Sequence, residues 1–196
     1  MSLIPAFEIG VWNAWIFMVA FVFFHMIQMP FMALFNRKAF DAMSQKAPQN
    51  PPYNPGERKV AALSYILLIL LFLYSIVLPL PLGSAWLYTG LAIFAVGVIV
   101  FQLAGVSWWY STSIDDPTIK GIYRYSRHPM YFGMLLELLG ISIAAASWLF
   151  LLLTIVLTVL MNSLVTAEER FCCEKFGDTY LNYMNQTPRW LGVPKS

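Results

Sequence analysis

Apolar residues occur along this chain in five long runs, which are separated by short polar segments. Each run is close to the roughly 20 residues that a helix needs to cross the hydrocarbon core of a bilayer. The pattern therefore predicts an all-α integral membrane protein with five transmembrane helices. The five expected spans cover residues 11–35, 60–80, 85–106, 129–146 and 147–165.

The last two runs adjoin each other, so we expect a helical hairpin with a very tight turn at residues 146–148. A re-entrant pair of short helices is the alternative. Beyond residue 165 the helix is expected to continue to Phe176, where Gly177 supplies a C-terminal stop. Residues 178–185 are then expected to form a short amphipathic segment on the membrane surface.

The basic residues all fall at one end of these predicted spans. With five spans, the loop of residues 36–59, the loop of residues 107–127 and the C-terminal tail share one side of the membrane. Lysine and arginine are enriched in cytoplasmic loops, so we expect the N-terminus outside and the C-terminus in the cytoplasm. The twelve basic residues are Arg37, Lys38, Lys46, Arg58, Lys59, Lys120, Arg124, Arg127, Arg170, Lys175, Arg189 and Lys195.

Composition agrees with a protein that is solvated mainly by lipid. Hydrophobic residues make up 59% of the chain and charged residues 11%, against about 25% charged residues in a typical soluble domain. The net charge of +2 gives no indication of nucleic-acid binding, and the two cysteines are adjacent, which excludes a disulfide framework. The first ten residues lack a basic region, so the first run is expected to be a retained span. Residues 36–59, rich in proline, are expected to form an irregular linker.

The most polar motif is GIYRYSRHPMYFG, at residues 121–133. His128 and Pro129 open the fourth predicted span, and proline suits the first position of a helix because its missing N–H has no partner there. A helix N-terminus favours a carboxylate or phosphate, and Arg124 and Arg127 can add contacts to the same anion. The alternative is a set of basic and aromatic residues at the membrane boundary, where both are common.

A pair of carboxylates, Glu168 and Glu169, ends the fifth predicted span. The hairpin should return them to the level of Arg127 and His128. Together these residues are either an ion-pair cluster that fixes the hairpin or the walls of a pocket for a zwitterionic cofactor. No Cys, His or acidic residue repeats at metal-ligand spacing, so we expect no metal site.

Glu137 lies deep in the fourth predicted span. An ionisable residue inside a membrane is a functional candidate, so one hypothesis is that Glu137 faces an acceptor tunnel and reads a lipid amine or takes its proton. The alternative is a protonated carboxyl group that is hydrogen-bonded between helices.

The pattern GxYRxxRHPxYxG, then an apolar hairpin, then EE and FGxxYxxY, resembles the C-terminal half of the isoprenylcysteine carboxyl methyltransferase and phospholipid methyltransferase group. The resemblance covers about residues 120–190 and is carried by the combination and order of its parts. The matching residues are Gly121, Tyr123, Arg124, Arg127, His128, Pro129, Tyr131, Gly133, Glu168, Glu169, Phe176, Gly177, Tyr180 and Tyr183.

The resemblance implies an integral membrane methyltransferase with S-adenosylmethionine as cofactor, held in a cytoplasm-facing pocket that the acceptor reaches from the lipid. It implies that Arg127 and His128, at the motif that includes Arg124 and Pro129, surround the anionic end of the cofactor. Glu168 or Glu169 would lie near its cationic or ribose parts. The tyrosines that would line the pocket are Tyr123, Tyr131, Tyr180 and Tyr183.

On this reading residues 1–110 form a substrate-side scaffold and residues 111–196 a methyltransferase core, in which Glu137, Glu168, Glu169 and Arg127 are the catalytic candidates. Because Glu137 offers an anionic group near the lipid, a phospholipid amine is the first candidate acceptor; a prenylcysteine carboxylate is second, and a small thiol or amine is third. The membrane is either the cell inner membrane or the endoplasmic reticulum.

Two other functional classes remain as alternatives. Membrane sterol reductases that use NADPH resemble this chain in the His-Pro pair and in the CCEKFGDTY segment, although Met130 stands where they favour asparagine. A non-catalytic membrane subunit or small transporter is the other alternative, in which the polar cluster is only an ion-pair clasp.

Overall fold

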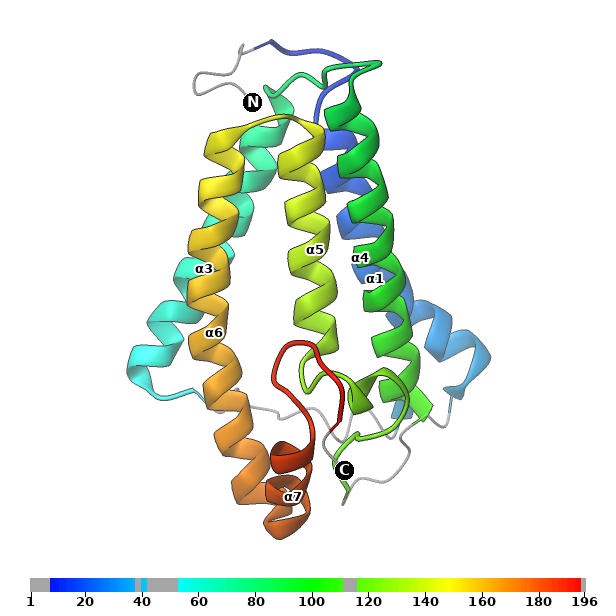
Figure 1. Cartoon of the computed structure of the whole chain (residues 1–196), viewed down its shortest axis with the longest axis vertical. Helices are drawn as coiled ribbons and strands as arrows, with labels where there is room; N and C mark the ends of the chain where they lie inside the picture. Colours follow the sequence, from blue (N-terminus) through cyan, green and yellow to red (C-terminus); the bar gives the residue numbers. More distant parts are fainter. Residues whose placement is uncertain (1–7, 38–39, 42–52, 111–115, 195–196) are drawn as a thin grey trace.

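The computed structural model describes residues 8–37, 40–41, 53–110 and 116–194. The described residues form a bundle of long antiparallel helices, and the C-terminal helix and tail lie across one end of it (Figure 1). Its helices are α1 (Trp15–Phe35), α3 (Pro55–Ile76), α4 (Ala85–Tyr110), the 3₁₀ turn η1 (Gly121–Arg124), α5 (Pro129–Ala144), α6 (Trp148–Phe176) and α7 (Asp178–Gln186).

Four of the five predicted spans are confirmed as helices that are long and apolar enough to cross a membrane: α1, α3, α4 and α6. The remaining predicted span, residues 129–146, forms the shorter α5 of 16 residues. At about 1.5 Å per residue this helix is about 24 Å long, which is less than the roughly 30 Å of a bilayer core. It packs against α4, α6 and α1, so neighbouring helices cover much of its surface.

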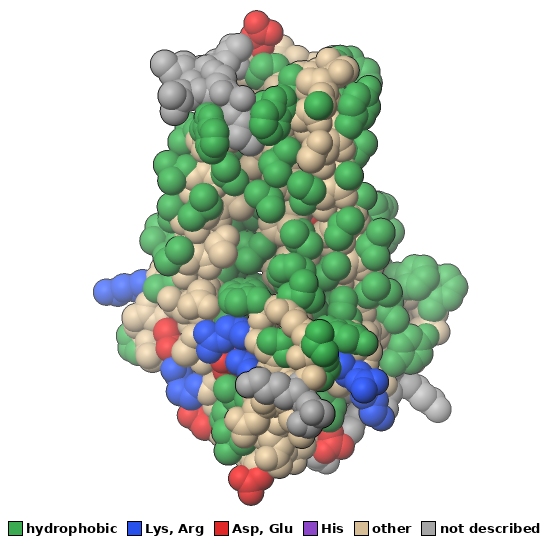
Figure 2. Space-filling model, viewed as in Figure 1, with side chains coloured by type: hydrophobic (Ala, Val, Ile, Leu, Met, Phe, Trp, Pro, Cys, Tyr) green, Lys and Arg blue, Asp and Glu red, His purple; other side chains and the backbone are tan. Residues whose placement is uncertain are grey.

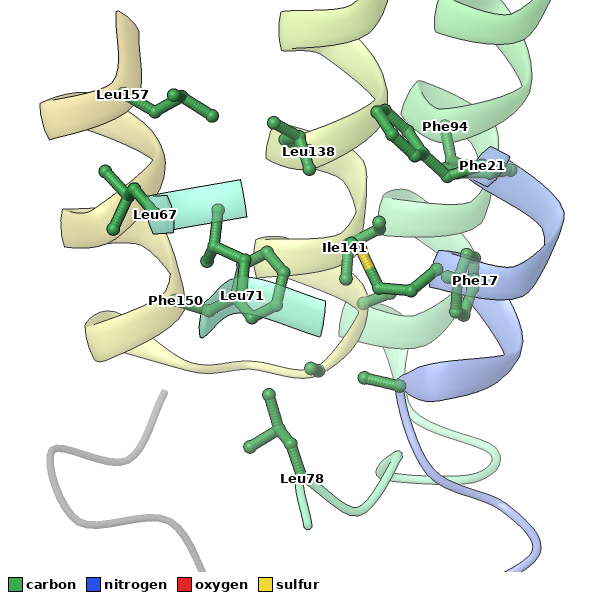
Figure 3. Close-up of a cluster of buried hydrophobic side chains, with 14 residues drawn as sticks. Phe17, Phe21, Leu67, Leu71, Leu78, Phe94, Leu138, Ile141, Phe150 and Leu157 are labelled. Carbon is green, nitrogen blue, oxygen red and sulfur yellow. The ribbon is translucent and has the colours of Figure 1, made fainter. Parts of the chain in front are cut away.

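The hydrophobic core joins all five of these helices at the end of the bundle that holds the α5–α6 turn (Figure 3). Phe17 of α1 and Phe94 of α4 pack edge to face, with ring centroids 5.2 Å apart. Ile141 of α5, Phe150 of α6 and Leu71 of α3 are fully buried in the same cluster. The apolar faces of the helices therefore converge on α5.

The predicted hairpin between α5 and α6 is confirmed, and its turn is short. Ala146 adopts a positive φ of 50°, and Ser147 is the N-cap of α6, where its hydroxyl accepts a hydrogen bond from the Phe150 amide. The Ser147 amide donates to the Ser142 carbonyl at 3.1 Å. These bonds satisfy backbone groups that a tight turn inside an apolar bundle would otherwise leave unpaired.

Two helix ends test the sequence predictions further. The helix α6 continues through Glu168 and Glu169 to Phe176 and ends at Gly177, which has a φ of 55°, as predicted. By contrast, α3 begins at Pro55 rather than at residue 60, so the expectation of an irregular linker up to residue 59 is wrong at its end. A capping box formed by Asn54 and Glu57 starts the helix there. Residues 42–52 of that linker lie outside the described part of the chain.

A glycine seam brings α4 and α5 unusually close together. A Cβ atom added to Gly97 of α4 would lie 2.7 Å from the Glu137 amide nitrogen of α5. One added to Gly140 of α5 would lie 2.5 Å from the Phe94 amide nitrogen of α4. Only glycine lets the two backbones approach to this distance, as at many helix contacts in membranes.

Charged side chains gather at the end of the bundle that carries α7 and the C-terminus, whereas hydrophobic side chains cover most of the rest of the visible surface (Figure 2). Many of the outward-facing residues on the long helices are large and apolar, such as Phe23, Ile69 and Val159. This division is the one expected of helices that stand in a bilayer with one polar end in water.

Candidate active site

The segment between η1 and α5 is fixed against the C-terminal tail. The Arg127 amide donates to the Pro188 carbonyl and the Gly192 amide donates to the Tyr125 carbonyl, both at 3.0 Å. The Tyr183 hydroxyl of α7 donates to the Tyr123 carbonyl at 2.6 Å. The motif at residues 121–133 and the end of the chain therefore form one polar layer at the end of the bundle (Figure 1).

The structure confirms the predicted start of α5 and the predicted return of the acidic pair. His128 is the N-cap of α5 and Pro129 occupies its first turn. The hairpin places Glu168 and Glu169 beside His128: Nδ1 is 3.9 Å from Glu168 Oε2, and Nε2 is 3.3 Å from Glu169 Oε1. Two motifs that are far apart in the sequence thus form one cluster.

Glu169 is the centre of a buried ion-pair network, and its side chain is only 4% exposed. Oε1 accepts from Arg127 Nη2 at 2.8 Å and from Arg127 Nε at 2.9 Å. Arg189 also binds this carboxylate, through Nη2 to Oε2 and through Nε to Oε1. Two arginines and a histidine beside one buried carboxylate hold it in its ionised form.

Arg127 has a protein partner for each nitrogen of its guanidinium group. Besides Glu169, it donates from Nη1 to the carbonyls of Met184 at 2.9 Å and Thr187 at 2.8 Å. These carbonyls belong to the C-terminal end of α7 and the residue that caps it, where a cation is favourable. The ion-pair clasp predicted as an alternative is therefore present around Arg127 and Glu169.

A cavity of about 620 Å³ opens beside this network. Arg127, His128 and Glu168 line it from the motifs that the sequence singled out, and Met130, Met134 and Cys172 also line it. Its aromatic lining consists of Tyr53, Tyr65, Phe101, Trp108, Tyr123, Tyr131, Phe171, Phe176, Tyr180 and Tyr183. All four tyrosines that the resemblance implied as pocket residues are thus brought together.

Glu168 is the acidic residue of the EE pair that lines this cavity. Its Oε1 accepts hydrogen bonds from the hydroxyls of Tyr131 and Tyr53, the latter at 3.3 Å. Adjacent residues of a helix point about 100° apart, which is why Glu168 faces the cavity while Glu169 faces the arginines. The neighbouring carboxylates therefore serve different parts of the site.

The tyrosines that line the cavity remain neutral at physiological pH. Burial raises the pKa of Tyr53 to about 12, and the negative charge of Glu168 raises it further. Burial likewise raises the pKa of Tyr123, of Tyr180 and of Tyr183. They therefore present uncharged aromatic rings to the cavity.

The other predicted site residues lie away from the described cavity lining. Glu169 is enclosed by its arginines, and Pro129 is buried at the start of α5. Arg124 lines a separate hollow beside α7, with Asn182 and Gln186. Glu137 is fully buried between α5, α1 and α4, with its Oε2 atom 3.8 Å from His25 Nδ1.

Sequence reasoning missed several residues of the site. Tyr53 belongs to a linker for which no structure was expected, and Arg189 follows Pro188 in a tail without periodicity. Lys175, which lines the cavity, carried no signal beyond its charge. Phe171 and Cys172 lie three and four residues after Glu168 on α6, so helical spacing could have found them.

Comparison with known proteins assigns the chain to a family. The sequence model described as phospholipid methyltransferase matches residues 82–179, which is half of the chain. A protein-S-isoprenylcysteine O-methyltransferase of Schizosaccharomyces pombe is 35% identical over 75 residues, a match that covers 38% of this chain and 31% of the relative. The chain belongs to the phospholipid methyltransferase family. The chain spans about a third of the length of this relative, and four of its described helices are long and apolar enough to cross a membrane.

Proposed function

We propose that this protein transfers a methyl group from S-adenosylmethionine to the amine headgroup of a phospholipid that enters the site from the bilayer. The observation that carries the proposal is the cavity in which the Glu168 carboxylate faces a lining of tyrosines. The cavity lies at the end of the bundle where charged side chains gather (Figure 2). The description of the matched family supports the choice of a phospholipid acceptor.

The cavity suits this cofactor in size and in chemical groups. Its volume lies within the range of about 300–1,000 Å³ that is typical of small-molecule sites. Glu168 can accept from an ammonium or hydroxyl group, and tyrosine faces attract a sulfonium cation. The first-turn amides of α5 and Lys175 can meet a carboxylate. Arg127 already donates hydrogen bonds to Glu169 and to two backbone carbonyls. Its role is therefore to hold His128 and the tail in place rather than to bind the cofactor through its guanidinium group.

The protein's part in the reaction is alignment and exclusion of water. When bound, S-adenosylmethionine supplies a methyl group on a positively charged sulfur. Displacement at such a carbon needs no covalent help from the enzyme, so fixed geometry and a dry site can supply much of the rate. An amine acceptor must also lose a proton. Because Glu168 is assigned to the tyrosines and the cofactor, Asp116, the other carboxylate of the described cavity lining, is the candidate to accept it.

The acceptor would reach the cavity from its apolar side. Tyr65 of α3, Phe101 of α4 and Met134 of α5 contribute lining on the part of the cavity that faces the helical bundle. These groups suit the acyl chains of a lipid. We further propose that the site faces the cytoplasm, in the cell inner membrane or the endoplasmic reticulum, because the basic residues lie at this end of the chain's spans.

Methylation of a prenylated cysteine carboxylate is the second candidate. It is favoured by the similarity to the Schizosaccharomyces pombe protein, whose name states that activity. A carboxylate acceptor is already ionised at neutral pH and needs no base. The two candidates therefore differ in their need for a proton acceptor in the cavity.

The test combines cofactor binding with acceptor choice. Binding of S-adenosylhomocysteine to the purified protein in detergent is measured by calorimetry for the wild type, His128→Ala and Glu168→Gln, with the exposed Glu174→Gln on the same helix as control. Methyl transfer is then measured with phosphatidylethanolamine and with a farnesylated cysteine in mixed micelles. We expect binding that both cavity variants weaken by at least tenfold and transfer to the phospholipid. No binding by the folded wild type contradicts the cofactor, and transfer only to the prenylcysteine contradicts the acceptor.

A further inference from the structure

Tyr53 reaches the cavity from outside the segment that the family model matches. It precedes α3, and its hydroxyl donates to Glu168 Oε1 at 3.3 Å. The Tyr53 carbonyl accepts a hydrogen bond from Arg58 Nε at 3.2 Å, which fixes the tyrosine's backbone against the first turn of α3. A residue of the N-terminal half thus directly contacts Glu168, one of the two acidic residues of the described cavity lining.

A second polar contact joins the same two elements. Glu57, in the first turn of α3, accepts from Arg170 of α6 through both carboxylate oxygens, at 2.9 and 2.8 Å. The same carboxylate completes the capping box of α3, because Oε2 also accepts from the Asn54 amide at 2.8 Å. Paired bonds between an arginine and a carboxylate fix orientation as well as distance. The start of α3 is therefore held beside residues 168–170 of α6 at two points.

From this arrangement, and resting on the proposed function, we infer that Tyr53 is a positioning residue that sets the orientation of the Glu168 carboxylate toward the cofactor. Tyr131 of α5 and Tyr53 both donate to Oε1. With Oε1 occupied from two sides, Oε2 is the oxygen left to meet a ligand, and its contact with His128 Nδ1 at 3.9 Å is longer than a hydrogen bond. The ligand group that this oxygen would take is a donor, either a ribose hydroxyl or an ammonium group.

The N-terminal half of the chain would thus help to orient the carboxylate that binds the cofactor. A carboxylate held by one hydroxyl can rotate about its last bond, whereas two donors, one from α5 and one from the segment before α3, define its plane. The Glu57–Arg170 pair keeps the start of α3, and with it Tyr53, at the distance that this second bond requires. Cofactor affinity should therefore depend on a residue that no part of the matched family segment contains.

The test isolates the Tyr53 hydroxyl. Affinity for S-adenosylhomocysteine is measured by calorimetry for the wild type, Tyr53→Phe, Glu168→Gln and the double variant, beside the melting temperature of each in detergent. Tyr88→Phe, an exposed tyrosine at the start of α4, is the matched control. Because the lost hydrogen bond acts on the ligand only through Glu168, we expect the effect of an ordinary net hydrogen bond of about 1 kcal/mol, which is about fivefold to tenfold weaker binding for Tyr53→Phe. The melting temperature should be that of the control.

A positioning role also predicts non-additivity. In the Glu168→Gln background, Tyr53→Phe should change affinity by less than about twofold, because its effect passes through the carboxylate. KM for S-adenosylmethionine should rise in Tyr53→Phe while KM for the acceptor stays constant. Arg170→Gln, which loosens the second contact, should weaken binding in the same direction by a smaller factor.

The outcomes separate this inference from the proposed function. If the folded wild type does not bind S-adenosylhomocysteine, the proposed function and the inference both fail. If the wild type binds and Tyr53→Phe binds equally well, only the inference fails. If Tyr53→Phe weakens binding equally with and without Glu168, the tyrosine acts on the ligand itself and the positioning role is wrong.

Discussion

Arg127 is the residue that connects the most parts of the site. One guanidinium group joins Glu169 of α6 to the carbonyls at the end of α7, directly before the N-cap of α5. Because both charges are buried, each depends on the other for stabilisation. Removal of one partner from a buried ion pair leaves an uncompensated charge.

We therefore expect Arg127→Gln to destabilise the protein by about 3 kcal/mol, seen as a lower melting temperature in detergent. Cofactor binding should fall with it, since His128 and the tail lose their common anchor. Arg189→Gln is the matched control. Because the Arg189 side chain is 30% exposed, its replacement should lower the free energy of unfolding clearly less than Arg127→Gln. Equal effects of the two substitutions would show that Arg127 has no special place in the network.

Glu137, unlike Glu169, is buried without a hydrogen-bond partner among the described residues. Both carboxylate oxygens lack one in the described structure, and His25 Nδ1, at 3.8 Å, bonds to the Phe21 carbonyl instead. The alternative for Glu137, a protonated carboxyl group that is hydrogen-bonded between helices, would require hydrogen-bond partners that the described residues do not supply. A buried polar group without partners lowers stability by about 1–3 kcal/mol.

This leads to opposed predictions for stability and activity. We expect Glu137→Met, which keeps the volume beside Gly97, to leave the melting temperature unchanged or raise it. On the hypothesis that Glu137 faces an acceptor tunnel, the same variant should reduce turnover of an amine acceptor. Affinity for S-adenosylhomocysteine should stay within about twofold of the wild type, because Glu137 lies outside the described cavity lining. A lower melting temperature together with full turnover would instead assign Glu137 a structural role.

At the residue scale, the sequence could predict which groups meet but not what each one does. The order of the GIYRYSRHPMYFG motif, the apolar hairpin and the EE pair was enough to predict that His128 lies beside Glu168 and Glu169, as it does in the structure. It could not show that Glu168 faces the cavity and Glu169 the arginines, because that depends on the rotation of α6 in the bundle. Tyr53 was unpredictable for a further reason: its contact joins residues 115 positions apart.

At the scale of elements, hydrophobic runs located the helices well and their ends less well. α6 was predicted through to Gly177 because a glycine stop is a local signal. α3 began earlier than its apolar run because a capping box in PPYNPGE starts a helix with polar residues. α5 could be recognised as apolar, but the reason that 16 residues suffice is its contact with three neighbouring helices, which is a tertiary property.

The seam between α4 and α5 is the contact on which the bundle depends most clearly. We expect Gly140→Leu to prevent correct packing, because even the first side-chain atom would lie 2.5 Å from the backbone of Phe94. Overpacking of this kind costs about 1–3 kcal/mol or more. The readout is the fraction of monodisperse protein after size-exclusion chromatography in detergent and its melting temperature.

Ala95→Leu provides the control, since it places the same leucine side chain on the exposed face of α4. It should behave as the wild type. Normal yield and stability of Gly140→Leu would mean that the two helices can separate without loss, and that the seam does not determine the fold.

At the scale of the whole molecule, the cavity draws on both parts into which the sequence was divided. Tyr53, Tyr65, Phe101 and Trp108 come from residues 1–110, and the remaining lining comes from residues 116–183. Because α4 packs along α5, the two parts share one bundle. Composition and charge predicted this general architecture, but not the cavity between the parts.

The orientation of the bundle in the membrane follows from which helix ends carry charge. The described basic residues lie after α1, at the start of α3, between α4 and α5, and from the end of α6 onward. These positions share one end of the bundle (Figure 1). The α3–α4 connection and the α5–α6 turn lie at the other end and contain no basic residue. By the positive-inside rule we expect the first end to be cytoplasmic.

Cysteine labelling with a membrane-impermeant maleimide tests this orientation, in a background where Cys172 and Cys173 are replaced by serine. We expect Leu82→Cys and Trp148→Cys, both exposed, to be labelled in intact cells, and Lys120→Cys to be labelled only after permeabilisation. Labelling at position 148 matters most, because the short α5 reaches the outer surface only if the α5–α6 hairpin crosses the bilayer. If position 82 is labelled from outside and position 148 is not, the hairpin is re-entrant and the protein has three crossing helices rather than five.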